Sequence, residues 1–277
     1  MSDLPRAALS GNLRLVCGAD PQRGTFLAEQ SFSAPIHLSK SYWDGETLLV
    51  NVVNQTAGIF GGDCISTHIV VEPRARVLLS SPSAARFHSS HGREARLEQV
   101  FDIRAGGSLD VLPEISIPQR DSRSFQKTSI RVEPGGELIY LETLAPGRVA
   151  SGEAFAFSHY SWRTDITVGD RLVHRERASL KPVDSSIAAL RAFFPASYYA
   201  GIILISPASE NWGPDFLHAV FDSGDDAPAK IAASKLNAHG WSIRLLAADS
   251  LALREGIRKL RKLIYERLNR RLPDPRR

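Results

Sequence analysis

The sequence predicts a mainly β protein: an elongated, β-helix-like stack of strands with a smaller α/β C-terminal portion that carries two or more helices. Three observations lead to this fold class. Short runs that bear valine and isoleucine alternate with turn residues through most of the chain. These turns recur roughly every 30 residues, as they do in stacked β architectures. After residue 181, longer segments with helical spacing replace them.

At 277 residues the chain can bury a large core, and we interpret it as one domain with three portions. Residues 1–30 hold an N-terminal segment and the first strands, residues 31–180 form a β-rich body, and residues 181–277 form the helix-containing portion. An apolar content of 43% and a charged content of 23% are ordinary for a soluble globular protein.

Turn signals separate the strands expected in the β-rich body. The strand of residues 130–132, for example, is followed by a Pro-Gly-Gly turn and then by the strand of residues 137–141. This pattern is typical of β-hairpins, and its recurrence favours stacked layers over a compact sandwich. The turns are residues 72–75, 104–107, 133–136 and 168–170.

A glycine-rich segment at residues 55–63 follows the alternating strand of residues 48–53. Glycine permits positive φ and close backbone approach, so this density in a β region indicates a bulge, a bend or a crowded contact. No Lys-Ser or Lys-Thr pair follows, which excludes a P-loop.

The C-terminal portion mixes helices and strands. We expect helices at residues 184–194, 213–221 and 230–239, and strands at residues 199–205 and 241–246. A last helix at residues 250–271 is capped by Asp249 and stops before Pro273.

The last helix is amphipathic. Its apolar stripe, which we expect to be buried, is Leu253, Ile257, Leu260, Ile264 and Leu268. Its basic residues occupy the remaining surface: Arg254, Arg258, Arg261, Lys262, Arg270 and Arg271. Contact of this basic helix with a membrane surface is the alternative to burial.

Charge and cysteine usage indicate a cytoplasmic protein. The longest apolar run, residues 198–205, is too short to span a bilayer, and the N-terminal residues lack the apolar stretch of a secretory signal. Cys17 and Cys64 form no Cys-x-x-Cys motif, which fits a reducing compartment. From residue 251 onward there are ten basic residues and three acids, so the net charge of +4 comes from the tail. A nucleic-acid groove across the body is therefore not expected, nor is a membrane anchor.

Motifs for hydrolysis or nucleotide binding are missing from the sequence. Residues 150–153, Ala-Ser-Gly-Glu, lack the flanking glycine of a nucleophile elbow, and neither a Walker nor a Gly-x-Gly-x-x-Gly pattern occurs. If the protein serves a GTP-driven process, the GTPase must be a partner.

Two pairs of residues are candidate metal ligands. His88 and His91 are close enough in sequence to chelate, and nickel suits imidazole and carboxylate ligands. The alternative is a pair of polar residues in a solvated loop. Asp63 beside Cys64 offers oxygen and sulfur, although an acid after Gly-Gly commonly binds backbone donors in its own turn.

Four acids lie next to apolar strands and are the last set of candidate functional residues: Asp63, Glu114, Glu142 and Glu153. A buried carboxylate is costly unless it is paired. These acids either form internal ion pairs with Arg86, Arg120 or Arg148, or line a water-filled passage for a divalent cation between weak sites.

Ordered sequence blocks around these residues resemble the family of the urease accessory protein UreD, also called UreH, from about residue 31 to about residue 271. The blocks are residues 57–63, 80–90, 112–118, 140–142 and 147–153. Residues that match the family pattern are Gly58, Gly61, Gly62, Asp63, Phe87, Glu142, Gly147, Arg148, Ala150, Gly152 and Glu153, and Arg86 stands where the family has lysine. Tyr140-Leu141 stands where the family has Gly-Trp. Glu114 lies one position before the acid of the family's Leu-Pro-Gln-Glu block.

The resemblance implies a non-enzymatic maturation factor with a β-helix-like fold that acts as scaffold or chaperone for nickel insertion into apo-urease. It implies as partners the accessory protein UreF, the GTPase UreG and the urease apoprotein subunits, with no tightly bound cofactor and nickel bound at most transiently. On this hypothesis Asp63, Glu142 and Glu153 are transit carboxylates, His88 and His91 are weaker metal candidates, and the matching glycines and arginines are structural. Two alternatives remain open: a stacked-β carbohydrate-active enzyme with paired acids, and an interaction module without metal transit.

Overall fold

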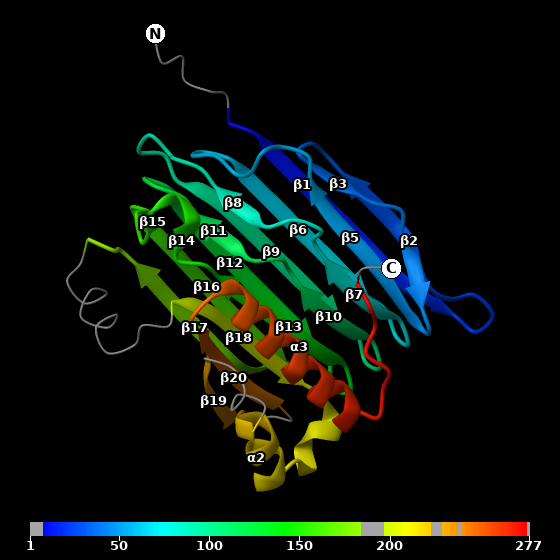
Figure 1. The fold of residues 1–277 in the computed structure, drawn as a ribbon. Coiled ribbons are helices and arrows are strands. Elements are labelled where there is room, and N and C mark those ends of the chain that lie inside the picture. The colour runs from blue at the N-terminus through cyan, green and yellow to red at the C-terminus, as the bar shows by residue number, and fades with distance from the viewer. Residues whose placement is uncertain (1–7, 184–196, 223–228, 238–239, 276–277) are drawn as a thin grey trace.

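The computed structural model describes residues 8–183, 197–222, 229–237 and 240–275. Strands dominate it and form two stacked sheets in a β-solenoid-like arrangement, with helices near the C-terminus (Figure 1). The predicted fold class is confirmed.

The first sheet is parallel in its centre and antiparallel at its edges, in the order β17-β16-β12-β9-β6-β1-β2. Its strands are β1 (Ser10–Asp20), β2 (Gly24–Phe32), β6 (Cys64–Val71), β9 (Ala95–Ile103), β12 (Arg123–Val132), β16 (His159–Val168) and β17 (Arg171–Leu180).

The second sheet has the order β19-β20-β18-β13-β10-β7-β5-β3, in which β13, β10, β7 and β5 are parallel neighbours and the pairs on either side of them are antiparallel. Its strands are β3 (Ile36–Leu38), β4 (Tyr42–Asp44), β5 (Thr47–Asn54), β7 (Arg76–Ser80), β8 (Ala85–Phe87), β10 (Ser108–Leu112), β11 (Ser116–Pro118), β13 (Glu137–Leu144), β18 (Tyr198–Ile205), β19 (Ala229–Lys235) and β20 (Gly240–Ala247). The C-terminal portion thus extends the same sheet as the β-rich body.

Three of the four predicted turns are not hairpins. The turns after β6, β9 and β12 lead into β7, β10 and β13, which belong to the other sheet, and only the turn at residues 168–170 joins an antiparallel pair, β16 and β17. Corresponding turn residues take positive φ, at Arg74 (67°), Gly106 (73°) and Gly135 (88°). The Gly106 amide donates to the Gly135 carbonyl at 3.1 Å, and the Arg74 amide donates to the Gly106 carbonyl at 3.2 Å, so the turns stack on one another as solenoid corners.

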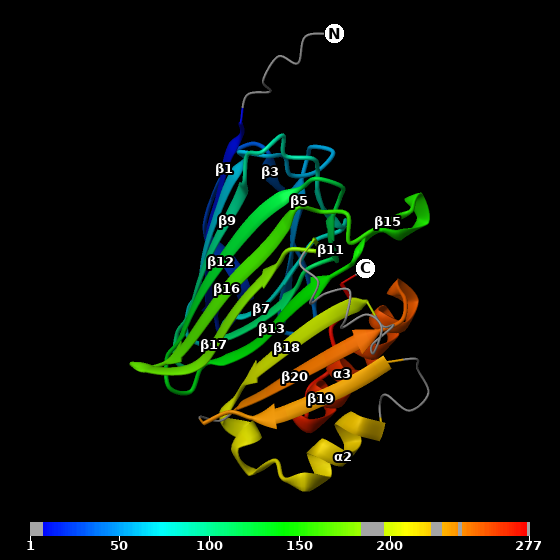
Figure 2. The same cartoon turned by 90° about the vertical axis from the view of Figure 1, so that its left-hand side faces the viewer.

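Two apolar layers hold the fold together. The first fills the space between the sheets and includes Leu15, Ile69 and Phe101. The second lies between the second sheet and the helices α2 (Pro214–Asp222) and α3 (Ser250–Arg267), which cover its outer face (Figure 2). Two 3-10 helices, η1 (Val149–Ser151) and η2 (Pro207–Asn211), and the short pair β14 (Gly147–Arg148) and β15 (Glu153–Ala154) complete the described elements.

The C-terminal predictions are partly confirmed. The strands β18 and β20 and the helix α2 lie where expected, and Asp249 caps α3 by accepting from the amides of Leu251 and Ala252. The helix predicted at residues 184–194 lies outside the described residues.

Two of these predictions are wrong. Residues 230–239 were expected to be helical, but Ala229–Lys235 form β19, an edge strand whose alternate residues pack on the outer apolar layer. Pairing with β20 outweighs the helical propensity of its alanines and lysines. The last helix ends at Arg267, because the following residues extend across the second sheet, where Arg270 pairs with Glu137 and Arg271 with Asp44.

Candidate functional site

A cavity of about 280 Å³ lies between the two sheets. Apolar side chains such as Val52, Leu97 and Trp162 form part of its wall, but Gln99, Gln126 and Glu142 also line it. A cavity of this size with polar groups in its wall can hold ordered water. The wall is mostly apolar, and these polar side chains occupy part of it.

Among the described residues, two carboxylates line this cavity, Glu142 and Glu114, and Glu142 belongs to the inner face of β13. Alternation along β13 turns it inward together with Tyr140, between the buried Leu138 and Leu144. Its Oε1 accepts hydrogen bonds from Tyr140 Oη at 2.7 Å and Thr164 Oγ1 at 2.8 Å. Burial raises the pKa of Glu142 above its usual range, even though these two hydrogen bonds favour the charged form.

Hydrogen bonds continue from this carboxylate across the interior. Tyr140 Oη lies 3.3 Å from Thr128 Oγ1, which donates to Gln99 Oε1 at 3.0 Å. Four strands of both sheets, β13, β16, β12 and β9, contribute to this row of polar groups.

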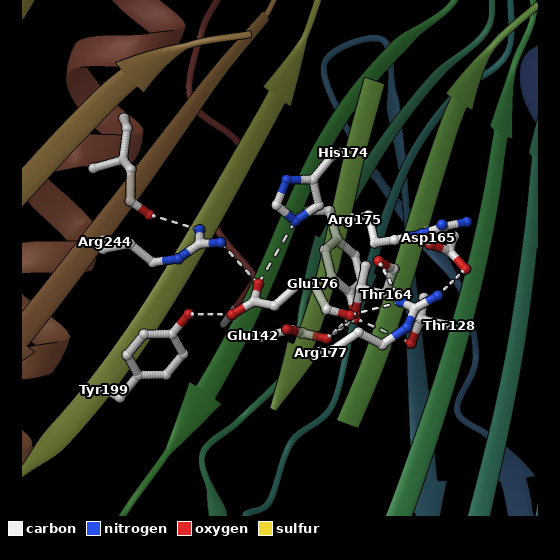
Figure 3. Close-up of polar contacts among 12 residues, drawn as sticks. Thr128, Glu142, Thr164, Asp165, His174, Arg175, Glu176, Arg177, Tyr199 and Arg244 are labelled. Atoms are coloured by element: carbon white, nitrogen blue, oxygen red, sulfur yellow. Dashed lines mark hydrogen bonds and ion pairs between the residues drawn. The ribbon is translucent and has the colours of Figure 1, made fainter. Parts of the chain in front are cut away.

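A second carboxylate, Glu176, lies where the edge of the first sheet meets the second (Figure 3). Its Oε2 accepts from Arg244 Nη2 at 2.7 Å, and its Oε1 accepts from Tyr199 Oη at 3.2 Å. His174 Nε2 lies 3.6 Å from Oε2. Burial alone would raise the pKa of Glu176, but the neighbouring His174 ring and the charge of Arg244 outweigh it and lower the pKa.

The cavity adjoins a larger groove, of about 1170 Å³, on the far side of the second sheet. The sheet is interrupted there, because β7 and β10 end before β8 and β11 begin. The residues that line both spaces are Ser81, Pro113, Glu114, Leu141 and Thr143. Glu114 therefore stands at the break between the interior and the groove that α3 borders.

The glycine-rich segment packs against the loop that carries the two histidines. A Cβ on Gly58 would lie 2.4 Å from the Arg86 carbonyl oxygen, and one on Gly61 would lie 2.5 Å from the Ser90 carbonyl oxygen. Gly62 has φ of 91° and lies against the Arg93 guanidinium. The expected crowded backbone contact is present, and it joins two of the sequence blocks.

Asp63 lies at 2% exposure and binds backbone donors. Its Oδ1 accepts from the Leu9 amide at 2.9 Å, and its Oδ2 accepts from the Phe60 amide at 2.8 Å. Cys64 is the first residue of β6 and is exposed, whereas Asp63 is buried.

Glu153 belongs to β15, which together with β14 and η1 forms a projection beside β11 (Figure 2). It accepts two hydrogen bonds from Arg148, at 2.8 Å from Nε and 2.6 Å from Nη2, and these hold its pKa below the usual range. Arg120 Nε lies 3.8 Å from Oε1. Gly147 has φ of 134°, and a Cβ there would lie 2.1 Å from the Glu153 carbonyl oxygen.

The two histidines lie in different surroundings. His88 stacks on Phe60 with ring centroids 4.3 Å apart, and its Nε2 lies 3.0 Å from the Ala57 carbonyl oxygen. His91 is exposed in a turn with φ of 44°. Over the residues that the structure describes, no group of three or more His, Cys, Asp and Glu side chains could hold a metal ion.

Comparison with known proteins decides the family. A family model described as UreD urease accessory protein matches residues 9–277. The chain belongs to the UreD family. It is 36% identical over 97% of its length to a urease accessory protein UreD of Opitutus terrae, of which it covers 98%. It is 28% identical over 87% of its length to the protein of the same name from Acetivibrio thermocellus, of which 92% is covered. It is 32% identical over 74% to that of Deinococcus radiodurans, of which 68% is covered.

UreD family membership supports a role in urease maturation and an interaction with the urease machinery. The relatives are named as accessory proteins and not as catalysts. In the described part of this family member, no helix is both long and apolar enough to cross a bilayer.

Sequence reasoning missed the groups around Glu176 in this UreD family member. Tyr199 and Arg244 reach Glu176 from strands distant in the sequence, so no local spacing indicates them. A signal for Glu176 itself does exist. His174 and Glu176 alternate with Arg175 and Arg177, so two titratable residues share the inward face of a predicted strand.

Proposed function

We propose that the chain is a non-enzymatic scaffold or chaperone in the cytoplasm that assists nickel insertion into apo-urease. It would act with UreF and would receive nickel from the GTPase UreG. Family membership supports the maturation role. The single observation that supports the transit role is Glu142, a buried carboxylate that lines a cavity between the sheets.

The proposed route leads from Glu176, at the junction of the sheets, past Glu142 and out at Glu114 toward the groove beside α3. One oxygen of Glu142 accepts both hydrogen bonds, which leaves the other oxygen for a passing cation. A lone carboxylate supported by hydroxyl groups suits an ion that must leave again. The broken sheet at residues 81–84 and 113–115 supports an exit there.

The internal contacts of Asp63 and Glu153 favour structural roles for both, so Glu142 is the carboxylate on which transit should depend. The second candidate function, an interaction module without metal transit, is favoured by these same contacts.

The test uses cells that carry a urease operon in which this chain replaces the resident accessory protein. We expect Glu142→Gln to co-purify with urease subunits as the unaltered chain does, while urease activity and its nickel content fall. Glu29→Gln, at an exposed glutamate, is the control for charge removal. Full nickel loading with Glu142→Gln would refute transit and leave the interaction module. Full loading in a strain that lacks the chain would refute the maturation role itself.

A further inference from the structure

The outer face of the first sheet is open. Its inner face packs on the core between the sheets, while α2 and α3 cover the second sheet on the other side of the molecule (Figure 2). The outer face of β9, β12, β16 and β17 is thereby left to solvent in the described part of the chain.

Three basic side chains stand side by side on this face. Lys127 of β12 is in register with Arg163 of β16, and Arg163 is in register with Arg177 of β17. We call Lys127, Arg163 and Arg177 the basic ladder. Neighbouring strands lie about 4.8 Å apart, and like charges directly opposite one another destabilise a sheet. In the free protein these like charges repel one another, and a bound anion would reduce that repulsion.

Among the described residues, acids on the same face pair with only one of the three members of the basic ladder. Arg177 forms an ion pair with Asp165 at 2.6 Å, but Asp165 also forms an ion pair with Arg175 at 2.8 Å. Among the described residues, no carboxylate forms an ion pair with Lys127 or Arg163, although Glu98 is in register with Lys127 on the neighbouring strand.

An aromatic ring beside the basic ladder orients its central member. The Phe125 ring lies 5.4 Å from the Arg163 guanidinium and 5.9 Å from that of Arg96. Such cation–π contacts hold a guanidinium in place while it keeps its charge. Arginine and aromatic residues are also the side chains most enriched in protein interfaces.

We propose that this open face docks the acidic surface of a partner protein, with a row of carboxylates set against the basic ladder. Carboxylates at positions i and i+4 of a helix are about 5–6 Å apart, which matches the spacing of cations on neighbouring strands. A nucleic acid fits less well, because Glu98, Asp102 and Asp165 lie on the same face and repel a continuous phosphate backbone. The inference does not depend on nickel transit.

The test measures binding of the full chain to a fluorescein-labelled, alanine-based helical peptide with glutamate at every fourth position. We expect saturable binding that weakens with sodium chloride. The Lys127→Glu/Arg163→Glu variant should bind at least tenfold more weakly. The control Arg23→Glu/Lys40→Glu changes the net charge equally at exposed positions elsewhere on the molecule, and should stay within twofold.

Three outcomes would overturn the proposal: no saturable binding by the unaltered chain, equal weakening by both double variants, or tighter binding of a labelled 20-nucleotide oligo(dT) that the Lys127→Glu/Arg163→Glu variant loses. If the double variant fails to fold, Lys127→Gln replaces it. That change removes repulsion, so the melting temperature should rise while peptide affinity falls. A fall in both would also count against the proposal.

Discussion

Asp110→Ala should destabilise the protein strongly, because Asp110 anchors the last helix to the second sheet. Asp110 lies on the outer face of β10, and its Oδ2 accepts from Arg261 and, at 2.8 Å, from Tyr265 Oη. The side chains of Arg261 and Asp110 are only 6% and 5% exposed. Removing the carboxylate leaves a buried guanidinium without its counter-ion.

The expected cost is about 3–5 kcal/mol, the range found when one partner of a buried ion pair is removed. Urea unfolding measures it. With a slope of ~2 kcal/mol/M, the midpoint should fall by about 1.5–2.5 M.

A double variant separates the loss of the pair from the loss of packing. Asp110 Oδ1 and Arg261 Nε have no hydrogen-bond partner among the described residues, so the buried pair is incompletely satisfied. Asp110→Leu/Arg261→Met replaces both charges with apolar groups and should therefore recover most of the stability lost in the single variant, although the buried Tyr265 hydroxyl still lacks its acceptor. A loss below ~1 kcal/mol for Asp110→Ala, or a double variant as unstable as the single one, would refute this reasoning.

Three further predictions concern the sequence blocks and the cavity. Gly61→Ala should lower stability by about 1–3 kcal/mol, because its Cβ would lie 2.5 Å from a carbonyl oxygen, whereas Gly213→Ala, whose nearest atom would be 3.6 Å away, should change the melting temperature little. The pKa of Glu142 is raised in the folded state, so its ionisation costs stability as pH rises through that value. Glu142→Gln should therefore raise the melting temperature more at pH 8 than at pH 4. A larger gain at pH 4 would contradict this. The pKa of Glu153 is lowered in the folded state, so its ion pair with Arg148 stabilises the protein above the ordinary value of 4.5 and is lost as pH falls through the folded value. Glu153→Gln at pH 7 should therefore speed amide hydrogen exchange in the projection of residues 147–154. Unchanged exchange there would show that the ion pair does not stabilise it.

The sequence predicted those structural features that depend only on residues close together in the chain. The apolar stripe of α3 and its Asp249 cap follow from helical spacing and cap chemistry. The glycine crowding near residue 60 follows from composition. Arg261 was expected on the polar face of that helix, yet it is buried, because its partner Asp110 comes from a strand 151 residues away.

Tertiary pairing decides the features that could not be predicted. Turn residues look the same whether the next strand joins the same sheet or crosses to the other, so the hairpin interpretation of the solenoid corners was open to error. For the same reason, the sequence of β19 predicts a helix, and only its pairing with β20 makes it a strand. At the site, Glu142 was singled out from its block and Tyr140 follows from alternation along one strand, but the cavity and the contact with Thr164 depend on how the sheets stack.

The way in which β18 joins β13 has a consequence for how the chain can be shortened. Residues 138–144 of β13 hydrogen-bond to β18, and their outward side chains, including Ile139 and Leu141, lie under the C-terminal helices. A fragment ending near residue 180 would expose both an unpaired strand edge and an apolar surface, and exposed strand edges promote self-association. Shorter versions made for partner studies would therefore be expected to precipitate, unless the missing strand is supplied in trans.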